Sequence, residues 1–297
     1  MTSASPSRRP GLAAVAFAPL LLLAAACTSQ SPAASSATTS STPPPSGADA
    51  ATAGGAPSSG GASGSRLAAV QAAKKLRVCT TGDYRPFSYL DPKTKKFTGI
   101  DITMAQDLAE SLGATPVFVQ TSWSDLLSTF TSSCDIAAGG ISITTQRAKQ
   151  AFYSVPTLTE GKTPITLCGN ESKYSTVAQI NRPGVRVITP VGGTNEAFAD
   201  KNFPKAQIIR FDDNNSIFDQ IVAGKADVMV TDASETKWVA HTTPKLCAVH
   251  PDKPFDFSQK AYLLPLGDVV FQQYVDHWLT IALHNGTYAA AEKPWYG

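Results

Sequence analysis

The chain has 297 residues, of which 25 are basic, 23 are acidic and 42% are hydrophobic. A chain of this length and composition can bury a sizeable core in one large or two medium domains. The near balance of charge gives no reason to expect nucleic acid as a partner, because nucleic-acid-binding proteins normally carry a basic face or stripe.

A short apolar run lies close to the start of the chain. It spans residues 12–26, follows Arg8 and Arg9, and ends in small residues before Cys27. A run of this length favours an export signal over a membrane-spanning helix. The string LAAAC that ends at Cys27 resembles a bacterial lipoprotein cleavage box, with Ala24 where leucine is usual. We therefore predict lipid attachment at Cys27, with plain secretion as the alternative.

Residues 1–27 are thus predicted to be a lipoprotein signal peptide, and their removal leaves 23 basic and 23 acidic residues. Residues 28–65 are almost entirely Ser, Ala, Thr, Pro and Gly, a composition that cannot bury enough apolar surface to fold. We predict a flexible, disordered linker here. The protein is expected in the cell envelope, on the outer face of the cytoplasmic membrane or in the periplasm, with the lipid anchor as its only membrane contact.

The first strand, loop and helix of the folded part lie between Leu76 and Gly113. Residues 76–80 are short, apolar and β-prone, which suits a parallel strand that is buried on both faces. Tyr84 and Phe87 lie in the loop at the carboxyl end of this strand, where open α/β sheets bind small molecules. Apolar residues then recur at helical spacing as far as Gly113. The unit predicts one wall of a ligand cleft, and the alternative is an aromatic hairpin tip on an ordinary α/β domain.

Strands and helices alternate along the rest of the chain, which predicts mainly parallel sheets with helical crossovers. The first set has a helix between two strands, at 124–131, 116–120 and 134–138. The second set has three strands, at 185–189, 207–211 and 226–231, and three helices, at 195–201, 215–223 and 234–241. Residues 161–168 and 246–250 run between the two sets and are predicted to be a pair of hinge strands, and residues 268–285 a terminal helix. Two sets and two crossings predict an α/β clamshell of two lobes.

Four cysteines follow Cys27, and none of them has the spacing of a zinc or redox motif. Cys168 and Cys247 lie on the two predicted hinge strands, so we predict a disulfide bond between them. Cys79 and Cys134 each lie in an apolar strand, where we expect buried thiols. The four histidines form no metal spacing, and the chain has no nucleophile elbow, Walker loop or dinucleotide fingerprint. We therefore predict neither a metal nor an organic cofactor.

Several segments resemble known proteins. Three segments resemble the first lobe of periplasmic amino-acid-binding proteins of the type II solute-binding fold, at 81–89, 99–113 and 140–147. Four longer strings resemble the exported cyclohexadienyl dehydratases: GKTPITLC at 161–168, GGTNEAFA at 192–199, FDQIVAGKADVMVTDASE at 218–235 and LCAVHPDKPFDFSQKAYLLP at 246–265. The likeness implies a type II periplasmic-binding-protein clamshell with two hinge crossings, with lobe 1 at residues 66–163 and 251–297 and lobe 2 at residues 164–250.

The dehydratases share the solute-binding fold, and they convert prephenate to phenylpyruvate, or arogenate to phenylalanine, by losing water and carbon dioxide together. The resemblance therefore implies a carbon–oxygen lyase that needs no cofactor and takes a small-molecule substrate. The alternative is a lipoprotein that delivers an amino acid to the permease of an ABC transporter. The fold and the lipid tether favour this alternative, whereas Glu235 and the strings of the second lobe favour the enzyme.

A substrate with two carboxylates and a ring hydroxyl needs cations for its acids and a proton for the departing hydroxyl. Arg147 follows Ser142 and Thr144, and a guanidinium fork is the best single match to a carboxylate. The matching arginine of binding-protein relatives grips the carboxylate of the ligand, so Arg147, Ser142 and Thr144 are predicted to bind substrate. Lys162 lies on a predicted hinge strand within reach of both lobes and is predicted to be catalytic, with a surface lysine as the alternative.

Two further groups are candidates for substrate binding. Gly192, Gly193 and Thr194 precede a helix, so their backbone amides and the helix dipole favour an anion site, with a simple turn that has Thr or Asn as its N-cap as the alternative. Tyr84, Phe87 and Trp123 are predicted to stack on the six-membered ring and exclude water, although aromatic residues in such numbers are more often part of a core.

Two glutamates are candidates for the proton donor. Glu196 lies in the first turn of its helix, where the dipole favours the ionised form and makes it a poor donor. Glu235 follows Asp232 by three residues, and two neighbouring carboxyls in a closed cleft resist ionising together. Glu235 also matches the general acid of the dehydratases, and Asp232 the residue that contacts the ligand amine in amino-acid binders. We predict Glu235 as the acid, and the alternative is a capped helix start with a helpful first-turn glutamate.

Overall fold

The computed structural model describes residues 64–296. The signal peptide, Cys27 and nearly all of the predicted linker lie outside these described residues. Within the described part, no helix combines the length and the apolar character that a membrane crossing needs.

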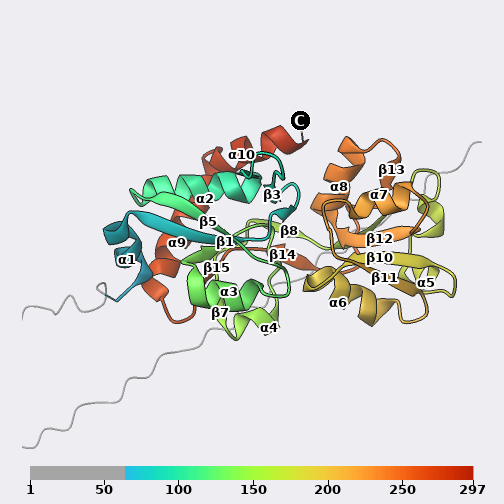
Figure 1. The fold of residues 1–297 in the computed structure, drawn as a ribbon, viewed down its shortest axis with the longest axis horizontal. Helices are drawn as coiled ribbons and strands as arrows, with labels where there is room; N and C mark the ends of the chain where they lie inside the picture. The colour runs from blue at the N-terminus through green and yellow to red at the C-terminus, as the bar shows by residue number, and fades with distance from the viewer. Residues whose placement is uncertain (1–63, 297) are drawn as a thin grey trace, which may run out of the picture. The chain divides into compact units, whose positions relative to one another are not determined.

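The first lobe is built on a five-stranded sheet in the order β5-β1-β6-β15-β7. Its central strand β1 (Lys75–Thr80) pairs in parallel with β5 (Thr115–Gln120) and β6 (Ile136–Ala137). β15 (Leu263–Pro265) then runs antiparallel to both β6 and β7 (Ala151–Tyr153). The chain thus returns to the first sheet after it has completed the second lobe (Figure 1).

Helices cover both faces of the first sheet, as its buried strand requires. Val78 packs against Met104 and Leu108 of α2 (Ile100–Ser111), on one face. The next residue, Cys79, faces α3 (Leu126–Ser133) on the other face. Figure 1 shows the two helices on opposite sides of β1. The loop with Tyr84 begins just after the carboxyl end of β1, at the edge of the sheet where α/β proteins bind ligands.

The second lobe is built on another five-stranded sheet, in the order β11-β10-β12-β9-β13. Its strands are β11 (Gln207–Phe211), β10 (Arg186–Pro190), β12 (Val228–Asp232), β9 (Lys162–Leu167) and β13 (Leu246–Ala248). β10 lies parallel to β11 and β12, whereas β9 is antiparallel to β12 and β13. α6 (Gly193–Asn202) packs on one face, and α7 (Ile217–Val222) and α8 (Ala233–Thr242) pack on the other.

The two lobes are joined by β8 (Leu158–Glu160) and β14 (Ser258–Lys260), which pair with each other as a short antiparallel ribbon. The prediction that residues 161–168 and 246–250 are the hinge strands is therefore wrong. These residues form β9 and β13, which lie side by side inside the second sheet. The physical reason is their apolar, β-prone sequence, which suits a buried strand, whereas the crossing strands are short and partly polar and give little signal.

The remaining elements are short or lie at the ends of the described chain. They are α1 (Arg66–Ala73), β2 (Asp83–Tyr84), β3 (Ser88–Leu90), β4 (Phe97–Thr98), α4 (Thr145–Ala148), a 3₁₀ turn (Glu171–Lys173), α5 (Val177–Ile180), α9 (Val269–His284) and α10 (Thr287–Tyr296). The terminal helix predicted at 268–285 is α9, and α10 follows it.

Both cysteine pairs are bonded. Cys168 and Cys247 form the predicted disulfide, with their Cα atoms 4.9 Å apart. The expectation of free thiols at Cys79 and Cys134 is wrong, because these residues are also bonded, with Cα atoms 5.8 Å apart. Cys79 lies on β1, and Cys134 follows α3 just before β6, the strand that pairs with β1. Strand pairing thus brings the two cysteines within bonding distance.

Candidate active site

A small cavity of about 20 Å³ lies where the two lobes meet, and both contribute its walls. The residues that line it are Tyr84, Trp123, Gly140, Ser142, Pro190, Gly192, Gly193, Thr194, Asn195, Asn214, Asp232 and Lys260. Pro190 and Asp232 are the last residues of β10 and β12, so the cavity lies at the carboxyl ends of parallel strands. A space of this size holds roughly one water molecule, so a six-membered ring can enter only if the walls move apart.

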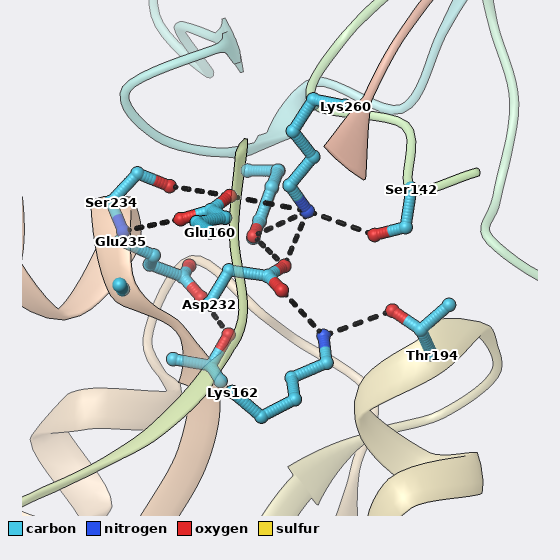
Figure 2. Close-up of polar contacts among 12 residues, drawn as sticks. Ser142, Glu160, Lys162, Thr194, Asp232, Ser234, Glu235 and Lys260 are labelled. Atoms are coloured by element: carbon cyan, nitrogen blue, oxygen red, sulfur yellow. Dashed lines mark hydrogen bonds and ion pairs between the residues drawn. The ribbon is translucent and has the colours of Figure 1, made fainter. Parts of the chain in front are cut away.

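Asp232 is the centre of the charged groups at the cavity. It ends β12, begins α8 as its N-cap residue and is 2% exposed. Figure 2 shows its carboxylate between two lysines, with Oδ1 2.9 Å from Lys162 Nζ and Oδ2 2.5 Å from Lys260 Nζ. The hydroxyl of Tyr84 also donates to Oδ2. Burial alone would raise the pKa of Asp232, but the two lysines outweigh it and hold the pKa well below its ordinary value.

Lys260 comes from the crossing strand β14, and its side chain is buried beside Asp232. Its Nζ donates to Ser142 Oγ at 2.9 Å and lies 3.7 Å from Glu160 Oε1, on the other crossing strand. Burial is the main reason why the pKa of Glu160 is raised, and Asp232 adds to it. Sequence reasoning missed Lys260 and Glu160. The one available signal was a basic side chain beside the apolar AYLLP segment.

Lys162 connects Asp232 to the start of α6. It is 2% exposed, so the alternative of a surface lysine is wrong. Its Nζ donates to Thr194 Oγ1 at 3.0 Å and to Asn195 Oδ1 (Figure 2 draws the first contact). Burial lowers the pKa of Lys162, and the neighbouring Asp232 opposes that shift. The first strand of the second lobe therefore delivers a buried cation to the cavity edge, between the two helix starts.

Glu235 lies in the first turn of α8 and is 2% exposed. Its Oε2 accepts a hydrogen bond from Thr231 Oγ1 at 2.5 Å, and Asn195 Nδ2 donates to the same hydroxyl oxygen at 2.8 Å. Burial is the main cause that raises the pKa of Glu235 to about 8; the Thr231 hydrogen bond opposes it, and Asp232 raises the pKa further. Most Glu235 side chains are therefore protonated at neutral pH. The carboxyl lies behind Asn195, which is part of the cavity wall. The Thr231 hydroxyl connects the two residues by hydrogen bonds.

Arg147 and Thr144 lie behind Ser142 rather than at the wall. Thr144 caps α4 by accepting a hydrogen bond from the Arg147 backbone N–H at 3.2 Å. The Arg147 side chain is buried, and its Nη1 donates to the Ser142 carbonyl at 3.0 Å. Burial lowers the pKa of Arg147. Ser142 thus lines the cavity, and the buried guanidinium of Arg147 lies behind it, in contact with the Ser142 carbonyl.

The predicted aromatic residues have two different positions: two line the cavity, and one packs behind the cavity wall. Tyr84 and Trp123 line the cavity, with their rings edge to face and their centroids 5.5 Å apart. Phe87 is 1% exposed and does not line the cavity; it stacks on Tyr84 at 5.6 Å, from within the core of the first lobe. Two of the three predicted rings therefore line the cavity, and the third, Phe87, packs behind Tyr84.

The start of α6 faces Trp123 across the cavity, and it includes the predicted anion site. Gly192 and Gly193 have φ angles of 78° and 79°, in the left-handed region that favours glycine. A Cβ at Gly192 would lie 2.6 Å from Ser124 Oγ of the opposite lobe, so this close approach also requires glycine. The N–H of Gly192 already donates to Glu196 Oε2 at 2.7 Å. Part of the predicted anion site is therefore occupied by a carboxylate of the protein itself.

Comparisons with known proteins agree with this geometry. The family model of bacterial extracellular solute-binding proteins, family 3, matches residues 76–297. Over 234 residues the chain is 51% identical to the cyclohexadienyl dehydratase of Pseudomonas aeruginosa. The aligned segment covers 78% of this chain and 86% of that protein.

Two solved structures of ancestral proteins are also similar. One is an amino acid-binding protein, a precursor of cyclohexadienyl dehydratase, with a TM-score of 0.72 at 32% identity over 78% of this chain and 100% of that chain. The other is an ancestral cyclohexadienyl dehydratase, with a TM-score of 0.50 at 44% identity over 78% of this chain and 96% of that chain. The chain therefore belongs to the bacterial extracellular solute-binding proteins, family 3, and shares half of its aligned residues with a cyclohexadienyl dehydratase.

Proposed function

We propose that this protein is an exported cyclohexadienyl dehydratase, which converts prephenate to phenylpyruvate, or arogenate to phenylalanine, without a cofactor. The observation that carries the proposal is Glu235, a buried carboxyl beside the cavity whose pKa is raised to about 8. A binding protein has no need for a protonated carboxyl there, whereas a dehydratase needs an acid for the departing hydroxyl. The identity of 51% to a cyclohexadienyl dehydratase supports the same reaction.

The reaction breaks two σ bonds of the substrate, and the water that leaves gains one O–H bond. The bond between the ring and its carboxylate breaks, so that carbon dioxide leaves and its electron pair enters the ring. The carbon–oxygen bond to the ring hydroxyl breaks at the opposite carbon, and the hydroxyl takes a proton from Glu235 and leaves as water. The ring is then aromatic. Glu235 remains as a carboxylate and must regain a proton from solvent before the next turnover.

The cations around Asp232 are suited to hold the two carboxylates of the substrate. Lys162 is buried at the cavity edge, and Arg147 lies behind Ser142. Each can form charge-assisted hydrogen bonds with a carboxylate, and Arg147 can do so with two parallel donors. Tyr84 and Trp123 supply apolar faces for the ring and keep water from the reacting atoms. For Glu235 to act as the acid, the hydroxyl must face the α8 side of the cavity.

We further propose that the protein is exported by the segment 1–27 and anchored by a lipid on Cys27. Its membership of an extracellular family supports export, and the LAAAC string supports the anchor. Metabolic labelling with a radioactive fatty acid tests the anchor: the wild type should take up label, and a Cys27→Ala variant should not. Absence of label from the wild type would leave a secreted protein without an anchor.

The proposed reaction is tested by incubating the purified protein with prephenate at neutral pH and following the appearance of phenylpyruvate. A Glu235→Gln variant is the matched control, because it keeps the shape of the side chain but has no transferable proton. The expected result is a rate that is proportional to enzyme and is lost in the variant. Tight binding of an amino acid with no turnover of prephenate or arogenate would instead identify a transporter subunit and contradict the proposal.

A further inference from the structure

The ammonium group of Lys260 is held by three kinds of group that would also bind the ammonium of an amino acid. Its Nζ lies 2.5 Å from Asp232 Oδ2, donates to Ser142 Oγ at 2.9 Å, and lies 5.2 Å from the centroid of the Tyr84 ring. A carboxylate, a hydroxyl and an aromatic face are together a favourable site for a primary ammonium. The side chain of Lys260 is 1% exposed, so this ammonium belongs to the cavity wall (Figure 2).

The carboxylate oxygens of Asp232 also bind other groups of the protein. Lys162 Nζ lies 2.9 Å from Oδ1, and the hydroxyl of Tyr84 donates to Oδ2. Glu160, the other acid near Lys260, is bound by Ser234, whose backbone N–H and hydroxyl donate to it at 2.7 and 3.1 Å. Glu235 is held by Thr231 and is mostly protonated at neutral pH. Asp232, Glu160 and Glu235 therefore each already have a partner within the protein.

An amine-bearing substrate would add a third ammonium to this cluster. The cluster already places two lysines on one aspartate, and like charges in a buried site disfavour one another. A substrate that carries carboxylates and no amine would bring no further positive charge to the cluster. The difference between the two candidate substrates lies in this one group, since prephenate ends in a keto acid and arogenate in an amino acid.

We propose that Lys260 is a specificity-determining residue, whose ammonium occupies the place that the α-ammonium of an amino acid would need, so that the site selects the keto-acid dianion prephenate over the aminated substrate arogenate. The inference rests on the proposed dehydratase function and names its preferred substrate. It also explains why Asp232, which matches the amine-binding residue of amino-acid binders, lies in contact with two lysines of the protein.

The inference is tested by the ratio of kcat/KM for prephenate to kcat/KM for arogenate. In the wild type the ratio should be about 10 or more, because hydrogen bonds to charged groups contribute about tenfold or more to affinity. Lys260→Met removes the internal ammonium and should lower the ratio about tenfold or more, with a gain for arogenate, since its amine can then reach Asp232. Lys237→Met is the matched control, because Lys237 is exposed, pairs with Asp252, and should leave the ratio unchanged.

Lys260→Gln serves as a second variant, since it keeps a donor for Ser142 but has no charge, and circular dichroism shows whether each variant is folded. A wild-type ratio of 1 or less would overturn the inference without any variant. An unchanged ratio in a folded Lys260→Met or Lys260→Gln protein would also overturn it.

Binding measurements separate this inference from the proposed reaction. In the Glu235→Gln protein, calorimetric titration should show tighter binding of prephenate than of arogenate, and Lys260→Met in that background should narrow or reverse the order. If the wild type turns over neither substrate, the proposed reaction fails, but this order of affinities still decides the role of Lys260. Equal affinity for the two compounds in both backgrounds would contradict that role.

Discussion

The first turns of α6 and α8 present the same residue type in two different settings. Each helix follows a strand of the second sheet, begins at the cavity, and has a glutamate in its first turn, Glu196 in α6 and Glu235 in α8. Glu196 accepts a hydrogen bond from the Gly192 N–H and pairs with Arg210, whose side chain is 47% exposed. Glu235 is buried, and among the described residues the hydrogen bond of its carboxyl is with the hydroxyl of Thr231.

This comparison shows that the surroundings of a first-turn glutamate, and not its place on the helix, decide whether it can serve as an acid. The helix dipole acts on both residues and favours a carboxylate in each. Burial raises the pKa of Glu235 to about 8 in spite of that, and the charge of Asp232 acts in the same direction. Lys162 and Lys260 lower the pKa of Glu235, but burial outweighs them, and both lysines are paired with Asp232. Glu235 can therefore give up a proton at neutral pH.

The largest expected effect is that of removing the transferable proton from α8. In Glu235→Gln, kcat should fall by about 10² or more, because general acid catalysis contributes a factor of that order. Affinity for prephenate should change little, since the amide keeps the shape of the side chain. Steady-state kinetics and calorimetry measure the two quantities. Full activity in this variant would show that Glu235 is not the acid, and Asp232 or Glu196 would be the next candidate.

A smaller effect is expected across the cavity, at Arg147. Arg147→Lys keeps the charge but loses the paired donors of the guanidinium, so KM for prephenate should rise about tenfold while kcat changes less. Because the proposed acid, Glu235, lies on α8, a change in the first lobe should alter substrate binding and not proton transfer. Arg147→Lys with wild-type KM and wild-type affinity would show that Arg147 holds Ser142 in place and does not contact the substrate.

The smallest effect is expected at the other first turn. Glu196→Gln weakens the contact with Arg210 and the interaction with the helix dipole, and the free energy of unfolding should fall by about 0.3–1 kcal/mol. Turnover should stay close to that of the wild type. Denaturant unfolding and an activity assay measure the two. A loss of turnover comparable to that of Glu235→Gln, in a folded protein, would mean that both helix starts take part in the chemistry.

Much of the framework was predictable because it depends on local pattern. The strand at 207–211 has the predicted bounds, and the apolar runs at 76–80 and 226–231 became β1 and β12 with shifts of at most two residues. Asp232 and the loop with Tyr84 each follow the carboxyl end of a strand, so their places at the edges of the two sheets were predictable, whereas their contact across the lobes was not.

The parts that were missed depend on contacts between distant residues. Lys260 is 28 residues from Asp232 and 118 from Ser142 along the chain, and only the return crossing brings it to both. The bond between Cys79 and Cys134 likewise depends on the pairing of β1 with β6. Neither relation leaves a periodic or spacing signal in one sequence. The seating of Phe87 behind Tyr84 is a third case, since an aromatic loop residue looks the same at a wall and in a core.

The central claim, that Glu235 is the protonated acid, is tested most directly by the pH dependence of kcat/KM for prephenate. Because the folded pKa is raised to about 8, the acid form is abundant at neutral pH and is lost as the pH rises through that value. We predict a kcat/KM that is level near neutrality and falls about tenfold per pH unit above about 8, and a residual rate in Glu235→Gln that lacks this fall. A profile that already declines above pH 5, or one that keeps the alkaline fall unchanged in Glu235→Gln, would contradict the account.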